Sequence, residues 1–159
     1  MKYLLLTILI VILSACSFKD YKHSSTNLLT IKTKRLKFSD LAYIRHINDK
    51  IEIDLYVAGK AVKQIDINYL ICIDDGCITK SKFNKLYLSS YYPDDILQNI
   101  FLGKKIFNGK NTTLTPNGFE QKIKDKHIDI KYILKQNKIY FKDRKNKILI
   151  KIKRIQDAK

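Results

Sequence analysis

The residues of this chain that could do chemistry are few, and its three cysteines are the most informative of them. Cys72 and Cys77 flank residues 73–76, an Ile-Asp-Asp-Gly turn signal between two β-like runs. A hairpin with a two-residue or a four-residue loop there would place both cysteines opposite each other, within bridging distance, so we expect a disulfide. The Cys-x4-Cys spacing differs from that of a Cys-x-x-Cys redox pair, so this disulfide is predicted to be structural.

The histidines and paired aspartates do not form a pattern typical of an active site. His23, His46 and His127 lie in separate segments without metal-ligand spacing, so surface or turn positions explain them better than a metal site. The aspartate pairs at residues 74–75 and 94–95 lie where turn and helix-start preferences already favour them. The sequence has no Gly-x-Ser-x-Gly elbow and no glycine-rich phosphate loop. We therefore expect no enzyme, no metal and no cofactor.

The third cysteine, Cys16, ends an N-terminal targeting segment. Lys2 provides a positive start, residues 3–13 are almost entirely apolar, and Leu-Ser-Ala-Cys closes the segment. This layout is typical of a secretory signal peptide, and the apolar run is too short for a membrane-spanning helix. The Leu-Ser-Ala-Cys ending resembles the lipobox of bacterial lipoproteins. That resemblance implies a signal peptide over residues 1–15 and an acyl anchor on Cys16. An ordinary secretory cleavage remains the alternative.

The charge of the chain limits its partners. Its 31 Lys and Arg against 15 Asp and Glu give a formal net charge of +16, which could attract phospholipid headgroups, lipopolysaccharide phosphates or nucleic acid. The lysines are scattered along the expected strands rather than clustered. Because an anchor outside the cytoplasm removes the usual encounter with nucleic acid, we expect membrane lipid, through acylated Cys16, as a partner and no nucleic acid. By the lipoprotein resemblance, Ser17 implies sorting to the outer membrane, with the domain facing the periplasm.

The rest of the sequence predicts one mainly β domain. Residues 16–27 are polar and unpatterned and are interpreted as a tether, followed by a single domain over residues 28–159. The Asn48-Asp49 turn between residues 43–47 and 50–57 predicts a hairpin. Its register would place Ala42, Ile44 and His46 opposite Leu55, Ile53 and Ile51, and Arg45 opposite Glu52.

Further strands are predicted on both sides of one helix. Apolar residues alternate from Ile65 to Ile73 in what is predicted to be a single strand, and residues 78–83 and 85–89 predict two more. Residues 93–103 predict the helix, with Pro93 at its first position and Gly103 at its C-terminal cap. Strands over residues 119–124, 128–134, 138–142 and 147–155 follow as a meander, the last with Ile148, Ile150 and Ile152 on one face.

These elements lead to a hypothesis about binding. An antiparallel sheet of about ten strands that curls around one amphipathic helix can form a trough for acyl chains. The candidate ligand-binding residues are the inward apolar residues of the strands and of the helix, which would serve as lid or plug: Ile51, Ile53, Leu55, Ile65, Ile67, Tyr69, Ile71, Ile96, Leu97, Ile100 and Phe101. The alternative is an ordinary closed core built by the same residues.

The order of elements also resembles that of a known family. Hairpins, an Asp-Gly turn at residues 75–76, the segment Tyr92-Pro93-Asp94-Asp95-Ile96-Leu97, a Pro-Asn-Gly turn and a final meander resemble the LolB-like bacterial lipoproteins, relatives of the LolA/LolB lipoprotein carriers. The resemblance covers residues 43–155. It implies an unclosed β half-barrel with a helical lid, lipidic or lipoprotein cargo received at the outer membrane, and a LolA-like periplasmic carrier as a partner. We expect the chain to be a monomer.

Two functions follow as hypotheses. The first is an outer-membrane-anchored lipoprotein that binds acyl chains or lipidated cargo in a hydrophobic cavity and passes it to the membrane. The second is an accessory lipoprotein without a ligand cavity, which docks an outer-membrane complex through its sheet edge or its basic surface. An open aliphatic cavity favours the first, and a fully packed interior favours the second.

Overall fold

The protein is mainly β. The computed structural model describes residues 23–74 and 76–155, and the predicted signal peptide and the predicted anchor at Cys16 lie outside these residues. One antiparallel sheet contains eleven strands. They are β1 (His23–Lys32), β2 (Lys37–Ile47), β3 (Lys50–Val57), β4 (Lys60–Ile67), β5 (Leu70–Ile73), β6 (Gly76–Thr79), β7 (Thr112–Thr115), β8 (Gly118–Lys124), β9 (Asp129–Lys135), β10 (Lys138–Asp143) and β11 (Ile148–Arg154). The helical elements are α2 (Lys80–Tyr87), α3 (Ile96–Leu102) and a 3-10 turn at Phe107–Gly109.

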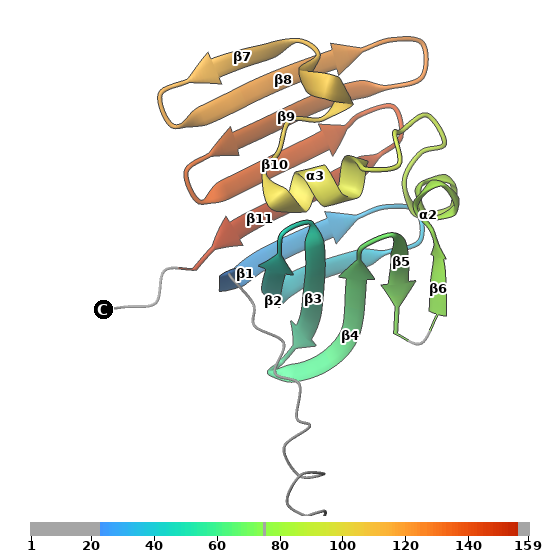
Figure 1. The fold of residues 1–159 in the computed structure, drawn as a ribbon, viewed down its shortest axis with the longest axis vertical. Helices are drawn as coiled ribbons and strands as arrows, with labels where there is room; N and C mark the ends of the chain where they lie inside the picture. Colours follow the sequence, from blue (N-terminus) through green and yellow to red (C-terminus); the bar gives the residue numbers. More distant parts are fainter. Residues whose placement is uncertain (1–22, 75, 156–159) are drawn as a thin grey trace, which may run out of the picture.

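The strand order explains where the helices lie. The strand order in the sheet is β6-β5-β4-β3-β2-β1-β11-β10-β9-β8-β7. β1 therefore lies in the middle, and β2 to β6 follow one another from there to one edge. The chain then crosses to the other edge and returns strand by strand until β11 pairs with β1. The crossing segment carries α2 and α3 over one face of the sheet (Figure 1). Because β6 and β7 form the two edges, the sheet is unclosed, as expected.

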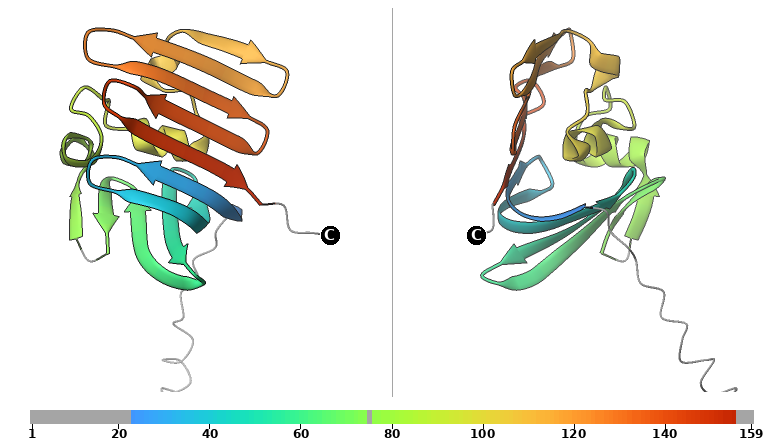
Figure 2. Two further views of the ribbon diagram at one scale, coloured as in Figure 1. Left: turned by 180° about the vertical axis from the view of Figure 1, so that it is seen from behind. Right: turned by 60° about the vertical axis from the view of Figure 1, so that its left-hand side comes forward.

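The sheet is bent around this crossing segment. Seen from the side, β1–β4 form one wall and β7–β11 the other, and α3 lies in the angle between them (Figure 2, right). The face toward the helices is here called the inner face, and the opposite one the outer face. Inward apolar side chains of both walls and of the two helices form one hydrophobic core. The burial of this common apolar surface is the main stabilising contribution.

The predicted β2–β3 hairpin is confirmed in its register. Ala42, Ile44 and His46 pair with Leu55, Ile53 and Ile51, and Arg45 pairs with Glu52. The turn residues and the apolar alternation favour the same register, and the register determines on which face of the sheet each side chain lies. A register shift between Leu55 and Tyr56 then bends β3 against β4.

The predicted single strand from Ile65 to Ile73 is wrong, because it is a hairpin. β4 ends at Ile67, β5 begins at Leu70, and Ile65 pairs with Ile73. The chain reverses so tightly that the inward residues keep their period of two on both sides of the turn. Apolar alternation alone therefore does not reveal this turn.

The strand predicted at residues 78–83 is wrong beyond Thr79, and the strand predicted at residues 85–89 is wrong throughout. β6 ends at Thr79, which caps α2 by accepting a hydrogen bond on its hydroxyl from the Lys82 backbone N–H at 3.2 Å. Phe83 and Tyr87, one helical turn apart, stack with ring centroids 4.6 Å apart. This i, i+4 pair is the helical signal in a segment too short to show a clear period.

The predicted helix is present but shorter than expected. α3 spans Ile96–Leu102, so Pro93 precedes the helix rather than occupying its first position. Gly103 takes the left-handed conformation at the C-terminal cap, with φ of 65°, as predicted. At the other end of the chain, β1 begins at His23, so the predicted domain boundary at residue 28 falls inside this strand and residues 23–27 are not tether.

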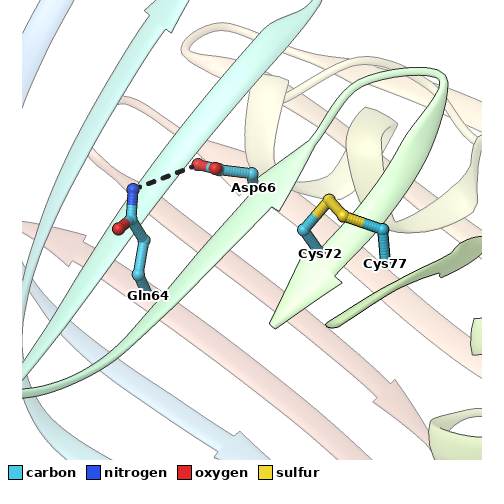
Figure 3. Close-up of a disulfide and its surroundings, with 4 residues drawn as sticks. All are labelled: Gln64, Asp66, Cys72 and Cys77. Carbon is cyan, nitrogen blue, oxygen red and sulfur yellow. Dashed lines mark hydrogen bonds between the residues drawn. A yellow bond between two sulfur atoms is a disulfide. The ribbon is translucent and has the colours of Figure 1, made fainter. Parts of the chain in front are cut away.

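The predicted disulfide is confirmed. Cys72 and Cys77 pair directly across the β5–β6 hairpin and are bonded (Figure 3), beside the Gln64–Asp66 hydrogen bond on β4. Ile73 pairs with Gly76, which matches the two-residue form of the predicted loop. The bond links β5 to β6, which is an edge strand and therefore has a neighbouring strand on one side.

Removing this disulfide is expected to lower the free energy of unfolding by about 2 kcal/mol, since closing so short a loop removes little chain entropy from the unfolded state. The measurement is urea unfolding of Cys72→Ser/Cys77→Ser beside the oxidised wild type. An unchanged unfolding midpoint would show that the hairpin holds without the bond.

Candidate functional site

The structure gathers all but one of the predicted ligand-binding residues into its interior. β3, β4 and β5 supply inward side chains, and α3 faces them with its apolar side. Those buried in this way are Ile51, Ile53, Leu55, Ile65, Ile67, Ile71, Ile96, Leu97, Ile100 and Phe101. Tyr69 does not join them, because it lies in the turn between β4 and β5 and is 90% exposed.

The trough beneath the helices is filled in this conformation. An enclosed apolar pocket remains between α2, α3 and the sheet, with a volume of about 10 Å³. Leu97 and Phe101 of α3, Phe83 of α2 and Ile65 of β4 are among its lining residues. A space of this size holds about one water molecule. An acyl chain can therefore enter the interior only if α3 is displaced from it.

A larger pocket opens at one end of the trough, where the C-terminal end of α3 meets both walls; it is called the end pocket here. Its volume is about 240 Å³. Apolar side chains from α3 and four strands line it together with polar side chains and one arginine. The lining residues are Ser25, Asn27, Ile44, His46, Phe101, Leu102, Gly103, Leu134, Gln136, Asn137, Ile139, Ile152 and Arg154. The combination suits a molecule with an apolar part and a polar or anionic end.

Histidine and arginine side chains shape the electrostatics of the end pocket. His46 stacks against His23 of the neighbouring strand, with ring centroids 4.8 Å apart. Burial lowers the pKa of His46, and electrostatic interactions with His23, Arg154 and Lys104 lower it further. His46 is therefore favoured in its neutral form, while Arg154 keeps a fixed positive charge at the pocket.

α3 is held in place by polar contacts at both of its ends. Gln98 donates to the Asp49 carbonyl in the β2–β3 turn and accepts from Lys80 Nζ at 2.5 Å. Just past the helix, Lys104 Nζ lies 2.6 Å from Asp49 Oδ1, and the Lys104 carbonyl accepts from the Tyr132 hydroxyl at 3.0 Å. These contacts tie the helix to one wall through Asp49 and to the other through Tyr132.

The segment before α3 is tied to a buried carboxylate. Asp143 is 0% exposed at the end of β10. It accepts hydrogen bonds from the Tyr92 hydroxyl at 2.6 Å, from the Asn146 side chain at 2.7 Å and from the backbone N–H groups of Asp129, Lys145 and Asn146. Burial, and then the contact with Asp143, raise the pKa of Tyr92, so its hydroxyl stays protonated and donates.

Sequence reasoning missed the Asp143 cluster and, apart from Phe101, the ligand-binding role of the end-pocket residues. Tyr92 and Asp143 are 51 residues apart in the chain and meet only through the sheet order. His23 was placed in a tether, and its pairing with His46 becomes visible only once β1 is known to begin at His23. The chain offers no local signal for either cluster.

The part of the chain that the structure describes contains neither a metal-binding cluster nor a membrane-spanning helix. Within residues 23–74 and 76–155, no group of three or more His, Cys, Asp and Glu is placed to hold a metal ion. None of the helices in these residues has the length and apolar character needed to cross a membrane. Comparisons with family models, curated proteins and solved structures found no match.

Proposed function

We propose that this protein is an outer-membrane-anchored, non-enzymatic lipoprotein that binds acyl chains or lipidated cargo between α3 and the bent sheet and passes it to the membrane. The observation that carries the proposal is the end pocket, where apolar side chains continue from α3 onto both walls and Arg154 lies at the opening. The unclosed antiparallel sheet with helices over its inner face is the kind of architecture that the LolB-like resemblance implies, together with its cargo.

The mechanism follows from the way α3 is held. At about 240 Å³, the end pocket is smaller than most pockets for drug-sized ligands, which have roughly 300 to 1,000 Å³. It takes one end of an acyl chain beside Phe101 and Leu102. Each methylene buried in the end pocket contributes about 0.8 kcal/mol, and further methylenes that displace α3 must offset the burial that its side chains lose. Because the Lys104–Asp49 ion pair just past α3 is exposed, it holds this end of the helix only weakly, and the buried Gln98 contact with the Asp49 carbonyl is the one that must break when the helix leaves the trough.

The test is binding of a fluorescent fatty acid and of its methyl ester to the purified full-length chain. Leu134→Trp places an indole in the end pocket and is expected to weaken binding of both probes by roughly tenfold. Leu114→Trp, at a side chain that is 74% exposed on β7, is the matched control and leaves binding unchanged. Arg154→Gln is expected to remove the preference for the acid over the ester. Wild-type protein that binds neither probe would end the proposal.

A second function is favoured by a different observation, the filled interior. A closed core with a pocket of about 10 Å³ suits an accessory lipoprotein that holds no cargo. Its docking element would be the edge strand β7, which leaves one side of Thr112–Thr115 without a neighbouring strand and exposes Leu114. Such an edge can accept a strand from a partner protein. This function predicts that β7, and not the end pocket, contacts a second molecule.

A further inference from the structure

The outer face of β8–β11 carries a concentration of lysines that the sequence alone does not reveal. Seen from behind, these strands lie in front of the helices, and no helix covers them (Figure 2, left). Lysines that are far apart in the chain lie side by side at the outward positions of these strands and of β1 and β2. The lysines of this face are Lys32, Lys37, Lys122, Lys124, Lys131, Lys135, Lys138, Lys142, Lys151 and Lys153.

The lysines are arranged in rows that run across the strands. In one row, Lys135 pairs with Lys138, which pairs in turn with Lys153. In a second row, Lys122 pairs with Lys131, which pairs with Lys142. The acidic residues among the same outward positions are Glu120, which forms ion pairs with Lys122 and Lys131, and Asp129, opposite Lys124.

This arrangement acts against the stability of the isolated domain. Like charges directly opposite each other on neighbouring strands repel, and alternating lysine with threonine or glutamate would avoid the repulsion. A positive field concentrated on one face attracts anions far more strongly than the same charge spread over the surface. The rows therefore point to an anionic partner that covers the whole face.

A depression of about 380 Å³ lies within this face, where the turn between β10 and β11 meets the end of β1. Four cationic side chains line it: Lys32, Lys142, Arg144 and Lys147. Asp143 also borders the depression, but its side chain is fully buried and lies on the inner face, opposite Ile130 and Ile148. A phosphate group in this depression would meet ammonium and guanidinium donors from several sides.

Exposed apolar side chains lie next to the lysine rows, and they indicate which kind of anionic partner this face would bind. The row of Lys135, Lys138 and Lys153 continues onto Leu28 of β1 and Leu41 of β2, which are 46% and 37% exposed. A lysine-rich surface that continues into exposed leucines matches a bilayer interface, where phosphates and acyl chains lie at adjacent depths. A soluble polyanion or a nucleic acid would use the lysines but not the leucines.

We propose that the outer face of β8–β11 docks on the surface of an anionic phospholipid bilayer, with headgroup phosphates over the lysine rows. In this orientation the inner face, which is covered by α2 and α3, points away from the bilayer. The proposal does not depend on whether the end pocket binds an acyl chain. Fixing the domain flat on the surface would also bring the edge strands β6 and β7 within reach of membrane-bound partners.

Sedimentation of the full-length chain, expressed without acylation of Cys16, with vesicles tests this docking. Neutral vesicles contain phosphatidylcholine alone, and anionic vesicles contain phosphatidylglycerol in addition. Lys135→Gln/Lys138→Gln/Lys153→Gln removes a row of like charges, so the variant should fold at least as well as wild type. Each lysine near an anionic surface contributes roughly fivefold to partitioning, so the variant is expected to lose at least about tenfold on anionic vesicles.

A charge-matched variant distinguishes the face from the net charge. Lys82→Gln/Lys85→Gln/Lys105→Gln removes the same charge from exposed positions in the helical segment and should keep wild-type partitioning. Amine labelling read by mass spectrometry should show protection of the outer-face lysines, but not of Lys82, Lys85 and Lys105, on anionic vesicles. Equal losses in the two variants, equal protection of both sets, or binding to heparin or DNA without binding to vesicles would overturn the proposal.

Discussion

Asp143→Ala is expected to lower the free energy of unfolding by about 3 to 5 kcal/mol, because it leaves several buried hydrogen-bond donors without an acceptor. The carboxylate is fully buried and accepts five hydrogen bonds in the structure. Its loss leaves the Tyr92 hydroxyl and three backbone N–H groups without their acceptor. Urea unfolding of the variant beside wild type measures this loss.

Tyr92→Phe serves as the graded control for the same cluster. It removes a single donor and leaves the carboxylate with its remaining contacts, so the expected cost is about 1 to 3 kcal/mol. Because Tyr92 belongs to the segment that leads into α3, hydrogen exchange in α3 should accelerate in this variant more than in β9 or β10. If the two substitutions cost the same, the Tyr92 contact would account for the whole effect of Asp143.

Leu97→Ala is expected to cost about 2 to 5 kcal/mol and to enlarge the enclosed pocket beneath α3. Leu97 is 4% exposed and lines that pocket. Leu114→Ala, the matched truncation at an exposed leucine of β7, should stay within about 0.5 kcal/mol of wild type.

The Leu97→Ala variant also tests whether the binding of a fatty acid stabilises the folded state. A fatty acid that binds the folded state raises the free energy of unfolding by an amount that grows with its concentration. Addition of a fatty acid is therefore expected to restore part of the stability lost in Leu97→Ala, because the enlarged space is apolar. A variant that is destabilised as expected but does not respond to the fatty acid would favour the accessory function over the carrier.

Local patterns were enough to predict several parts of the fold. The β2–β3 register follows from alternation that agrees with an Asn-Asp turn, and both observations fix the same face for Ile44 and Ile53. The cysteine pair is predictable because the turn between them is short. The apolar face of α3 is predictable because Ile96, Leu97, Ile100 and Phe101 recur at helical spacing, and its C-terminal end is predictable from Gly103.

The remaining parts depend on tertiary information. α2 has only eight residues, too few for a clear helical period, and its Phe83–Tyr87 stack follows a strand-like segment. The lysines of the outer face look scattered in the sequence because only the strand order places Lys135 beside Lys138 and Lys138 beside Lys153. The end pocket likewise needs β1, β2, β9, β10 and β11 in register before its lining exists.

Photo-crosslinking in cells tests the central claim, that the inner side of the bent sheet receives acyl chains. p-Benzoylphenylalanine replaces Leu134 in the end pocket, and in a second strain it replaces Leu114 on the edge strand β7. The carrier function predicts an acyl-chain adduct at residue 134, identified by mass spectrometry, and none at residue 114. A protein adduct at residue 114 with no lipid at residue 134 would contradict it.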